Sequence, residues 1–509
     1  MDRHLIHCSS QASRELLTIQ TAPSRVAAGW RLAGKGPGAF EGLEATMTMD
    51  KNQGSVSINP ATGELIKAYP WQSADEVERV LVANATAQRI WASTSMADRV
   101  ACYRRLAATI RERSEALSLL ATSEMGKTLA ASRAEMEKCA LALEWFAQHG
   151  PAILADEPVE SDTGDQVHVS YLPIGSILAV MPWNFPFWQA LRAAGPIMLS
   201  GNGFLLKHSR NVMGCAYAFQ DAYEASGFPK GLFANLHITD DVAAAVIADN
   251  RVAAVTVTGS MRAGSAVAST AGKAMKKSLL ELGGADPFIV LADAHIDKAV
   301  EVGITARFQN AGQVCLAAKR FILERPIAEE FTSKFVAAAT RLKVGDPLAD
   351  ATDIGPIARG DLREGIDDQV QRSIAKGARL LLGGKSVDGP GFFYEATVLA
   401  DVAPGMAAFD EEIFGPVAAI SVADDLEDAI RLANSSDYGL SGNLWTSNTS
   451  KASEIARRLE TGGVFVNSYS VSNPRVPVGG VKRSGYGREL SHFGLREFVN
   501  AQTVWIKQI

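Results

Sequence analysis

Residues 251–272, "RVAAVTVTGSMRAGSAVASTAG", predict a strand, a tight turn and a helix in direct succession. The first eight residues are mostly β-branched or small and apolar, which favours a buried strand. Gly259 and Ser260 then form the expected turn, and Gly264 follows in the helix. Because glycine lacks a Cβ, the backbone can approach a ligand there, and a helix N-terminus favours a phosphate. A simple packing turn would also explain two glycines, since the stretch is not GxGxxG.

The same alternation continues on both sides of this stretch. We predict buried strands in "GSILAVMPWN" at 175–184 and "GFLLKHS" at 203–209, with a helix at 187–200 between them. Further upstream, Ser73 and Glu76 form a capping-box pattern at the start of a helix over 73–93. Helices that alternate with short apolar runs predict an α/β fold with a largely parallel sheet.

Length and composition narrow the function classes. A chain of 509 residues exceeds the usual size of one core, so two or three domains are expected. Five scattered cysteines without a CxxC pair predict reduced thiols, a cytoplasmic location and no metal cluster. A net charge of -6 without a Lys/Arg stripe argues against nucleic acid and anionic membranes as partners. Prolines interrupt the most apolar run, 174–191, so no membrane span is expected and a small soluble substrate is favoured.

Two segments are set apart from the rest. We expect residues 1–50 to be a disordered extension; a transit peptide and a start codon assigned upstream of Met47 or Met49 are the alternatives. His4, His7 and Cys8 in this segment do not predict a metal site. "EMGKT" at 124–128 resembles the end of a Walker loop, but Ala121 stands where the first glycine is needed, so no ATPase is predicted.

Two polar residues could carry covalent chemistry. In "FQNAGQVCLAAKR" at 308–320, Cys315 has small neighbours and two basic residues nearby, so it is either a nucleophile or a small core residue. In "LELGGADPF" at 280–288, Glu281 precedes two glycines where the chain turns sharply. It is either a general base or a helix-terminal surface glutamate.

Two further motifs supply an amide, a carboxylate and a ring. Asn184 lies between aromatic residues and prolines in "PWNFPFW", where its amide could hold an oxyanion or could belong to an ordinary turn. In "EEIFGPV" at 411–417, Glu412 and Phe414 offer a hydrogen-bond acceptor and a ring face. Either residue could also be an ordinary surface or packing residue.

Taken in order, these stretches resemble aldehyde dehydrogenases from about residue 53 to the C-terminus, through "PWNFP", "TGS", "ELGG", "GQVC" and "EEIFGPV". The resemblance implies that Cys315, as a thiolate, attacks an aldehyde. The Asn184 amide and the Cys315 backbone N–H would hold the oxyanion, and Glu281, as a carboxylate, would activate the water that hydrolyses the thioester.

The resemblance also implies NAD or NADP as the cofactor, held by a set of positions that match the family: Trp183, Lys207, Gly259, Ser260, Gly264, Leu282, Glu412 and Phe414. Arg210 stands where strictly NAD-using members carry a glutamate. A guanidinium there can pair with a 2′-phosphate, which favours acceptance of NADP, whereas the alternative is an arginine in solvent.

Within the family, "WNFPFWQALR" and the C-terminal text look most like bacterial succinate-semialdehyde dehydrogenases. Arg192 would then bind the distal carboxylate, and a helix that begins near Pro186 would place Asn184 and Arg192 around one tunnel. A second arginine of well-known members is Gln309 here, which makes Ser472 and Arg475 candidate replacements. The second cysteine of some relatives is Ala317, so a disulfide at the nucleophile is not expected.

Several alternatives remain. A broad-specificity aldehyde dehydrogenase would use Phe187 and Trp188 as pocket walls and Arg192 as a structural ion-pair partner. Glu281 disfavours a coenzyme A acylating enzyme, and the lack of a histidine partner motif disfavours a cysteine hydrolase. A non-catalytic protein with the same fold would not require Cys315, Asn184 and Glu281 together.

The resemblance finally implies three structural parts and a homodimer or homotetramer. Residues 51–150 and 174–283 would form the dinucleotide-binding domain, and 284–488 the catalytic domain. Residues 151–173 and 489–509 would form the oligomerisation elements, because the strand "TVWIKQI" is an apolar edge that needs a partner.

Overall fold

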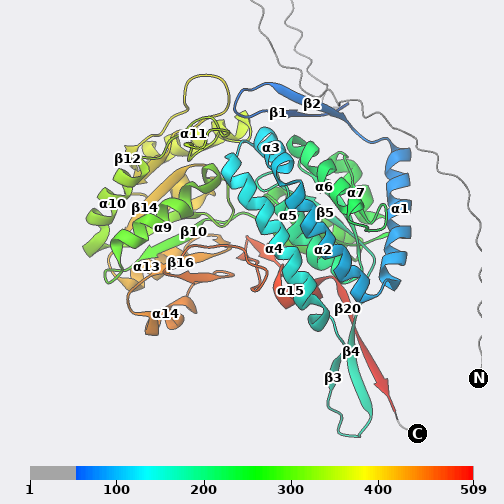
Figure 1. Ribbon diagram of the computed structural model, residues 1–509. Helices are drawn as coiled ribbons and strands as arrows, with labels where there is room; N and C mark the ends of the chain where they lie inside the picture. The colour runs from blue at the N-terminus through cyan, green and yellow to red at the C-terminus, as the bar shows by residue number, and fades with distance from the viewer. Residues whose placement is uncertain (1–52, 508–509) are drawn as a thin grey trace, which may run out of the picture. The chain divides into compact units, whose positions relative to one another are not determined.

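The computed structural model describes residues 53–507 (Figure 1). The predictions for residues 1–50, including those for His4, His7 and Cys8, lie outside the described residues. Within residues 53–507, no helix is long and apolar enough to cross a bilayer.

The first large sheet has six strands in the order β19-β9-β8-β5-β6-β7. All neighbours run parallel except β19, which pairs antiparallel with β9, so the predicted parallel sheet is confirmed. The strands are β5 (Ser176–Met181), β6 (Gly203–His208), β7 (Phe233–Asn235), β8 (Val252–Thr258), β9 (Lys277–Glu281) and β19 (Gly485–Tyr486).

The strand order reverses at β5. The chain passes from β5 to β6 and β7 on one side, then crosses back so that β8 and β9 lie on the other side. In an open parallel sheet, such a reversal leaves a crevice at the carboxyl ends of the two central strands. The segments that follow β5 and β8 contain Asn184 and Gly259, so the topology brings these two motifs together.

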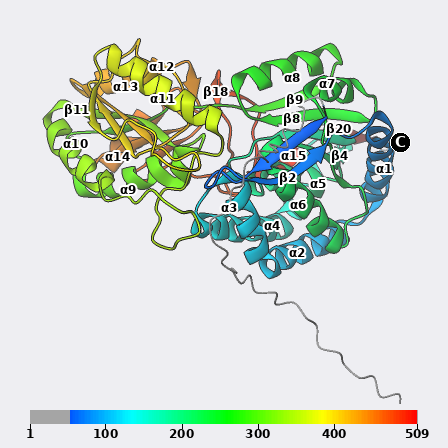
Figure 2. The same ribbon diagram turned by 90° about the horizontal axis from the view of Figure 1, so that it is seen from above.

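Helices cover both faces of this sheet. Figure 2 shows α7 and α8 on one side of β8 and β9, and α4 and α5 on the other. The helices of this part are α1 (Ala74–Ser93), α2 (Met96–Glu112), α3 (Ser114–Met125), α4 (Leu129–Ile153), α5 (Trp188–Leu199), η1 (Arg210–Val212), α6 (Met213–Ala225), α7 (Asp240–Ala248) and α8 (Met261–Lys273). The predicted capping box is present: the Ser73 hydroxyl accepts from the Glu76 backbone, and the Glu76 carboxylate accepts from the Ser73 N–H.

The second large sheet has seven strands in the order β12-β13-β14-β11-β10-β16-β17, parallel except for β12. Its strands are β10 (Asp286–Val290), β11 (Ala318–Glu324), β12 (Arg379–Leu382), β13 (Thr397–Ala400), β14 (Val417–Ala423), β16 (Gly442–Trp445) and β17 (Val464–Val466). Its helices are α9 (Ile296–Phe308), η2 (Gln309–Gly312), α10 (Arg325–Ala339), α11 (Gly360–Ala375), α12 (Ala407–Asp410), α13 (Leu426–Asn434) and α14 (Thr449–Ala456).

Three smaller sheets complete the described fold. The predicted C-terminal strand is present as β20 (Val499–Ile506), which pairs antiparallel with β4 (Gln166–Pro173), and β4 pairs with β3 (Glu157–Val159). The other ladders join β1 (Gly54–Ile58) to β2 (Leu65–Pro70), and β15 (Tyr438–Gly439) to β18 (Val481–Lys482); α15 (Ser491–Glu497) precedes β20. The predicted domain limits stay a prediction. The strand β19 lies within 284–488, the range predicted for the catalytic domain, but joins the six-stranded sheet.

Candidate active site

One cavity brings together the motifs that the sequence singled out. It lies at the carboxyl ends of β5 and β8, where the strand order reverses. Its lining comprises Pro182, Trp183, Asn184, Gln189, Thr258, Gly259, Ser260, Leu282, Gly283, Cys315, Leu362, Glu412 and Phe414. Five segments far apart in the chain therefore meet at one thiol.

The loop that carries Cys315 has an unusual backbone. It connects α9 to β11, and Asn310, Ala311 and Gly312 all have positive φ. A Cβ on Gly312 would lie 2.2 Å from the Gly415 carbonyl oxygen, so only glycine fits there. Buried Arg307 donates to the carbonyls of Gly312, Ile413 and Gly415 and so ties this loop to the segment that contains Glu412.

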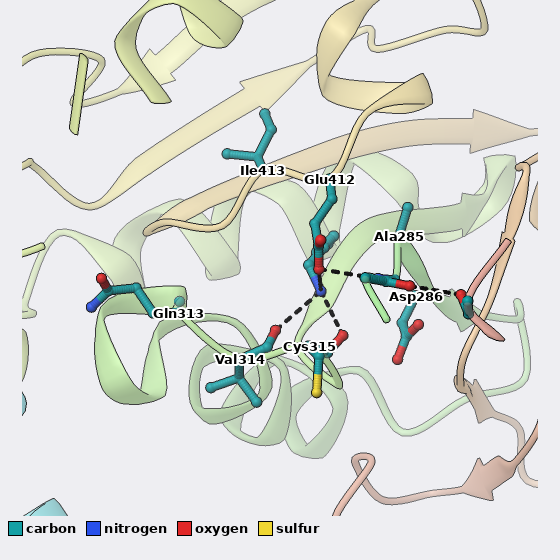
Figure 3. Close-up of polar contacts among 12 residues, drawn as sticks. Ala285, Asp286, Gln313, Val314, Cys315, Glu412 and Ile413 are labelled. Carbon is teal, nitrogen blue, oxygen red and sulfur yellow. Dashed lines mark hydrogen bonds and ion pairs between the residues drawn. The ribbon is translucent and has the colours of Figure 1, made fainter. Parts of the chain in front are cut away.

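Lys319 forms a second tie between the same segments, and Figure 3 shows its contacts as dashed lines that reach Val314, Cys315 and Glu412. Its ammonium donates to the carbonyls of Cys315 at 2.6 Å and Val314 at 3.1 Å, and it lies 3.3 Å from a Glu412 carboxylate oxygen. The same oxygen accepts from the Gly284 N–H at 3.0 Å. Figure 3 shows the Cys315 sulfur turned away from Glu412. Lys319 therefore holds the backbone of the nucleophile loop and leaves the thiol free.

The second basic residue after Cys315 does not face it. Arg320 is buried and donates to the carbonyls of Ala285, Leu432 and Ala433. Of the two basic residues in the "CLAAKR" segment, only Lys319 contacts Cys315.

Cys315 is partly exposed to the cavity, and protein surrounds it on its other sides. Burial raises the pKa of its thiol to about 11, although Arg192 and Lys319 act in the opposite direction. In the protein without ligand, Cys315 is thus a thiol at neutral pH. The thiolate that the resemblance implies requires a base that takes this proton.

Glu281 is a buried carboxyl at the end of β9, so the interpretation of Glu281 as a helix-terminal surface glutamate is wrong. Burial raises its pKa to about 8; Arg192 lowers the pKa and Glu489 raises it. Within the described residues, its Oε1 has no hydrogen-bond partner. The group therefore changes charge near neutral pH and has one oxygen available to accept a proton.

Arg192 lies close to Glu281, and neither residue is among those that line the cavity. It is 1% exposed, its Nε pairs with Glu489, and its Nη2 lies 3.9 Å from Glu281 Oε2 and donates to Thr258 at 3.3 Å. The helix α5 begins at Trp188, two residues after Pro186, so the predicted start near Pro186 is confirmed. These contacts favour the alternative in which Arg192 is a structural ion-pair partner; binding of a substrate carboxylate by Arg192 stays a prediction.

Asn184 lies in the cavity and is fixed by its neighbours. Its side-chain amide donates to the Gln313 carbonyl at 3.0 Å, and Asn310 donates to the Asn184 carbonyl at 2.9 Å. These contacts hold the amide beside the loop that carries Cys315. The geometry is compatible with an oxyanion donor, the role predicted for it.

A buried ion pair that sequence reasoning missed supports the turn around Asn184. Glu135 accepts from the backbone N–H groups of Phe187 and Trp188 at 2.9 and 2.8 Å, and pairs with Lys127 at 2.5 Å. Lys127 also lies 3.9 Å from the centre of the Phe185 ring. Lys127 of "EMGKT" thus helps to stabilise the turn between β5 and α5 through Glu135. Nothing in the local sequence of Lys127 indicated that Glu135, eight residues further on, is its partner.

A second cavity lies on the other side of the α8 N-terminus. Apolar side chains line part of it, including Val180, Ile247 and Val267, and Lys207, Arg262 and Asp240 line the remainder. Lys207 pairs with Asp240 at 2.9 Å. Hydrogen bonding and charge from Lys207, and the charges of Arg210 and Arg262, lower the pKa of Asp240. An apolar slot beside several cations fits an adenine and a phosphate.

The residues predicted for the cofactor fall into three groups. Trp183, Ser260, Leu282, Glu412 and Phe414 line the first cavity, and the rings of Trp183 and Phe414 meet edge to face at 5.7 Å. Gly259 faces open space, whereas a Cβ on Gly264 would lie 2.6 Å from Leu282, so Gly264 serves helix packing. Lys207 lines the second cavity, and Arg210 is exposed at the start of η1. Arg262, within the strand-turn-helix segment 251–272, also lines the second cavity and was not predicted to be a cofactor residue.

The predicted substrate residues differ from one another. Ser472 is buried and accepts hydrogen bonds from Lys138 at 2.8 Å and from the Trp188 indole at 3.1 Å. Arg475 is exposed, and only its backbone N–H is involved, in a bond to Asn473. Lys138 was missed, because its position in an ordinary helix gives no sign of its partner 334 residues away.

The model of the aldehyde dehydrogenase family matches residues 47–504. The chain belongs to this family. The resemblance and the fold predicted from the sequence are therefore confirmed. Among aldehyde dehydrogenase family relatives, the chain is 50% identical over 463 residues to "Succinate semialdehyde dehydrogenase [NAD(P)+] Sad" of Escherichia coli K12; the match covers 91% of this chain and all of the relative. It is 45% identical to "Probable succinate-semialdehyde dehydrogenase [NADP(+)]" of Synechocystis, over 88% of this chain and 99% of that protein.

Solved structures agree with this assignment. The chain superposes on succinic semialdehyde dehydrogenase from Streptococcus pyogenes in complex with NADP+ with a TM-score of 0.87 at 35% identity, over 89% of this chain and all of that one. It likewise superposes on succinate-semialdehyde dehydrogenase from Burkholderia pseudomallei with a TM-score of 0.86 at 33% identity, over 90% of this chain and 95% of that one. This aldehyde dehydrogenase thus has the fold of the family over its described length.

Proposed function

We propose that the protein oxidises succinate semialdehyde to succinate with NADP or NAD as the oxidant. The observation that carries this proposal is the match, at 44–50% identity over 88–91% of the chain, to proteins named succinate-semialdehyde dehydrogenases. Cys315 and Asn184 line one cavity and Glu281 interacts electrostatically with Cys315, which supports the same chemistry.

The first step is formation of a bond between the Cys315 sulfur and the aldehyde carbon. Cys315 needs a base, because its thiol pKa is raised to about 11. Glu281 interacts electrostatically with this thiol and has a pKa near 8, so its carboxylate is the group that accepts the proton. The oxyanion of the resulting thiohemiacetal accepts a hydrogen bond from the Asn184 amide and another from the Cys315 backbone N–H.

The residues of the two cavities fit the cofactor. The Trp183 and Phe414 rings and Glu412 would hold its nicotinamide end, and the apolar slot beside Lys207 and Arg262 its adenosine end. When bound, the cofactor accepts the hydride that leaves the substrate carbon. Arg262 and Arg210 supply positive charge for a 2′-phosphate, which favours NADP.

The second half of the reaction releases the acid. The carbonyl carbon is then a thioester of Cys315, and Glu281 takes a proton from the water that attacks it. The C–S bond breaks, the carboxylate leaves and the sulfur is free for another cycle. Glu281 thus acts twice as a base, and it must release the Cys315 proton to solvent before it can accept the proton of water. The second proton returns to the sulfur as the C–S bond breaks. The Glu281 Oε1 atom, which has no hydrogen-bond partner among the described residues, supports this role.

The test is the steady-state kcat/KM for succinate semialdehyde and for butanal, each with NAD and with NADP, measured by absorbance of the reduced cofactor. We expect a preference for the semialdehyde and for NADP, and no turnover in Cys315→Ala. Equal use of both aldehydes would select the broad-specificity alternative, which the pairing of Arg192 with Glu489 favours. Dehydrogenase activity in Cys315→Ala would overturn the thioester mechanism.

Three organisational features belong to the same proposal. We propose a cytoplasmic location, which the free cysteines Cys102, Cys139, Cys215 and Cys315 support. A homodimer or homotetramer is supported by the ribbon of β3, β4 and β20, on which Leu172, Trp505 and Ile506 are exposed. We also propose the domain limits at 150, 173, 283 and 488, which the separation of two large sheets and a ribbon supports, with β19 as the one strand within 284–488 that joins the first large sheet.

A further inference from the structure

Lys138, on α4, is a largely buried cation beside the catalytic site. Its ammonium donates to Ser472 Oγ at 2.8 Å and lies 4.3 Å from the centre of the Trp188 ring. It also interacts electrostatically with Cys315. Among residues 53–507, no carboxylate forms an ion pair with it, and Glu135, one turn earlier, is paired with Lys127. An ammonium in this position has hydrogen-bonding capacity and charge that the protein itself does not use.

Ser472 completes a site of two donors. A hydroxyl has two acceptor positions and one donor. Lys138 and the Trp188 indole N–H fill both acceptor positions of Ser472. Its own O–H has no acceptor within the described part of the chain, so the hydroxyl and the ammonium are both free to donate to an anion. A carboxylate has the oxygens to accept from both donors.

The site is connected to the reacting centre through α5. Trp188, which contacts both Lys138 and Ser472, is followed by Gln189, which lines the cavity and donates to Asn184 Oδ1 at 3.4 Å. The anion site and the proposed oxyanion donor are thus attached to the same short segment. Lys138 also lies close enough to Cys315 to interact with it electrostatically, so its ammonium can attract an anionic group of a substrate bonded to Cys315.

The other nearby cations are less suited to this task. Arg192 is already paired with Glu489 and lies close to Glu281, so a further carboxylate would compete with two buried anions. Lys319 is used by two carbonyls and by Glu412. Arg475 is exposed to solvent, where a single ion pair contributes little.

We propose that Lys138 and Ser472 bind the distal carboxylate of the substrate and that Lys138 is the main determinant of specificity for an ω-carboxylated aldehyde. This inference rests on the proposed function and deepens it, because it assigns the substrate's charged group to residues other than Arg192. Burial and the charge of Arg192 lower the pKa of Lys138 to about 8, which leaves it charged at neutral pH.

The test compares kcat/KM for succinate semialdehyde and butanal in the full-length wild type, Lys138→Met and Lys138→Arg, with the cofactor that the wild type prefers. Lys298→Met is the control, since this lysine is exposed on α9 and pairs only with Glu301 at 2.8 Å. We expect Lys138→Met to reduce the ratio of the two kcat/KM values by about tenfold to a hundredfold, mainly through KM for the semialdehyde. Lys138→Arg should retain most of the ratio, and Lys298→Met all of it.

The outcomes separate the two proposals. A wild type that prefers the semialdehyde while Lys138→Met keeps that preference would overturn the role of Lys138 and leave the substrate assignment intact. If the wild type shows no preference for the semialdehyde, both the role of Lys138 and the substrate assignment would be overturned. Equal losses in Lys138→Met and Lys138→Arg would show that packing rather than charge is responsible, which also overturns the inference. If Lys138→Met does not yield folded protein, Lys138→Gln replaces it with the same expectations.

Discussion

The two sides of the catalytic site are stabilised by different kinds of contact. On the side of Cys315, Arg307 and Lys319 fix the loop mainly through hydrogen bonds to backbone carbonyls, which do not titrate. On the side of Glu281, the neighbours are Arg192 and Glu489, so the charge of the base depends on other ionisable groups. The contacts on the first side fix the position of the loop that carries Cys315. The contacts on the second side set the proton affinity of the Glu281 carboxylate.

The largest effect is expected from a variant that removes the basic carboxylate at position 281 and keeps a side chain of the same shape. Glu281→Gln cannot take a proton from Cys315 or from water, so we expect kcat to fall by about 10²- to 10⁴-fold. The nucleophile loop should keep its structure, because no bond from Glu281 supports it. Steady-state rates and circular dichroism test both statements, and a variant with more than a tenth of the wild-type rate would contradict the role of Glu281.

A second change tests whether the neighbours of Glu281 set its charge. In the wild type, kcat/KM should rise as the pH increases through about 8, because Glu281 and Cys315 must lose protons to act. Glu489 raises the pKa of Glu281, so Glu489→Gln should move this rise to lower pH.

The same substitution leaves Arg192 without its buried partner and should lower the free energy of unfolding by about 3–5 kcal/mol. Rates between pH 6 and 10 and urea denaturation provide the measurements. Glu427→Gln, which removes one partner of an exposed pair with Arg458, is the control. A pH profile that stays in place would contradict the proposed coupling.

The smallest effect concerns the second cavity, where the charges are near solvent. Arg262→Ala should reduce the kcat/KM for NADP relative to NAD by about two- to tenfold, since a partly exposed charge contributes little. The loss should shrink as salt is added, because screening weakens the same interaction in the wild type. Arg379→Ala, at an exposed pair with Asp401, controls for the loss of a surface arginine. An unchanged cofactor ratio would exclude Arg262 from recognition of the phosphate.

Much of the fold and the position of the nucleophile could be predicted because their signals are local. The alternation of β5, α5, β6 and of β8, α8 is visible in short apolar runs that end in turn residues. Asn184 and Gly259 follow directly after strands, and parallel strands bring such residues to one edge. The family motifs then placed Cys315 and Glu281 in the same reaction.

The supporting contacts could not be predicted in this way. Lys138 and Ser472, or Arg192 and Glu489, are far apart in the chain, and only the packed structure brings them together. The spacing of Asn184 and Arg192 suggested a shared tunnel. The helix begins close to the predicted start, at Trp188, but the Arg192 guanidinium pairs with Glu489. Spacing along a helix does not reveal which distant residue a side chain will pair with.

The carbonyl contacts around Cys315 have a consequence for how this sequence can change over time. Every amino acid has a backbone carbonyl, so the acceptors at 314, 413 and 415 survive most replacements of the residues that carry them. The donors Arg307 and Lys319 have no such freedom, since few side chains can reach several carbonyls at once. Tolerance to mutation should therefore be uneven around this loop: Arg307, Lys319 and the closely packed Gly312 and Gly415 are fixed, whereas Val314 and Ile413 can vary.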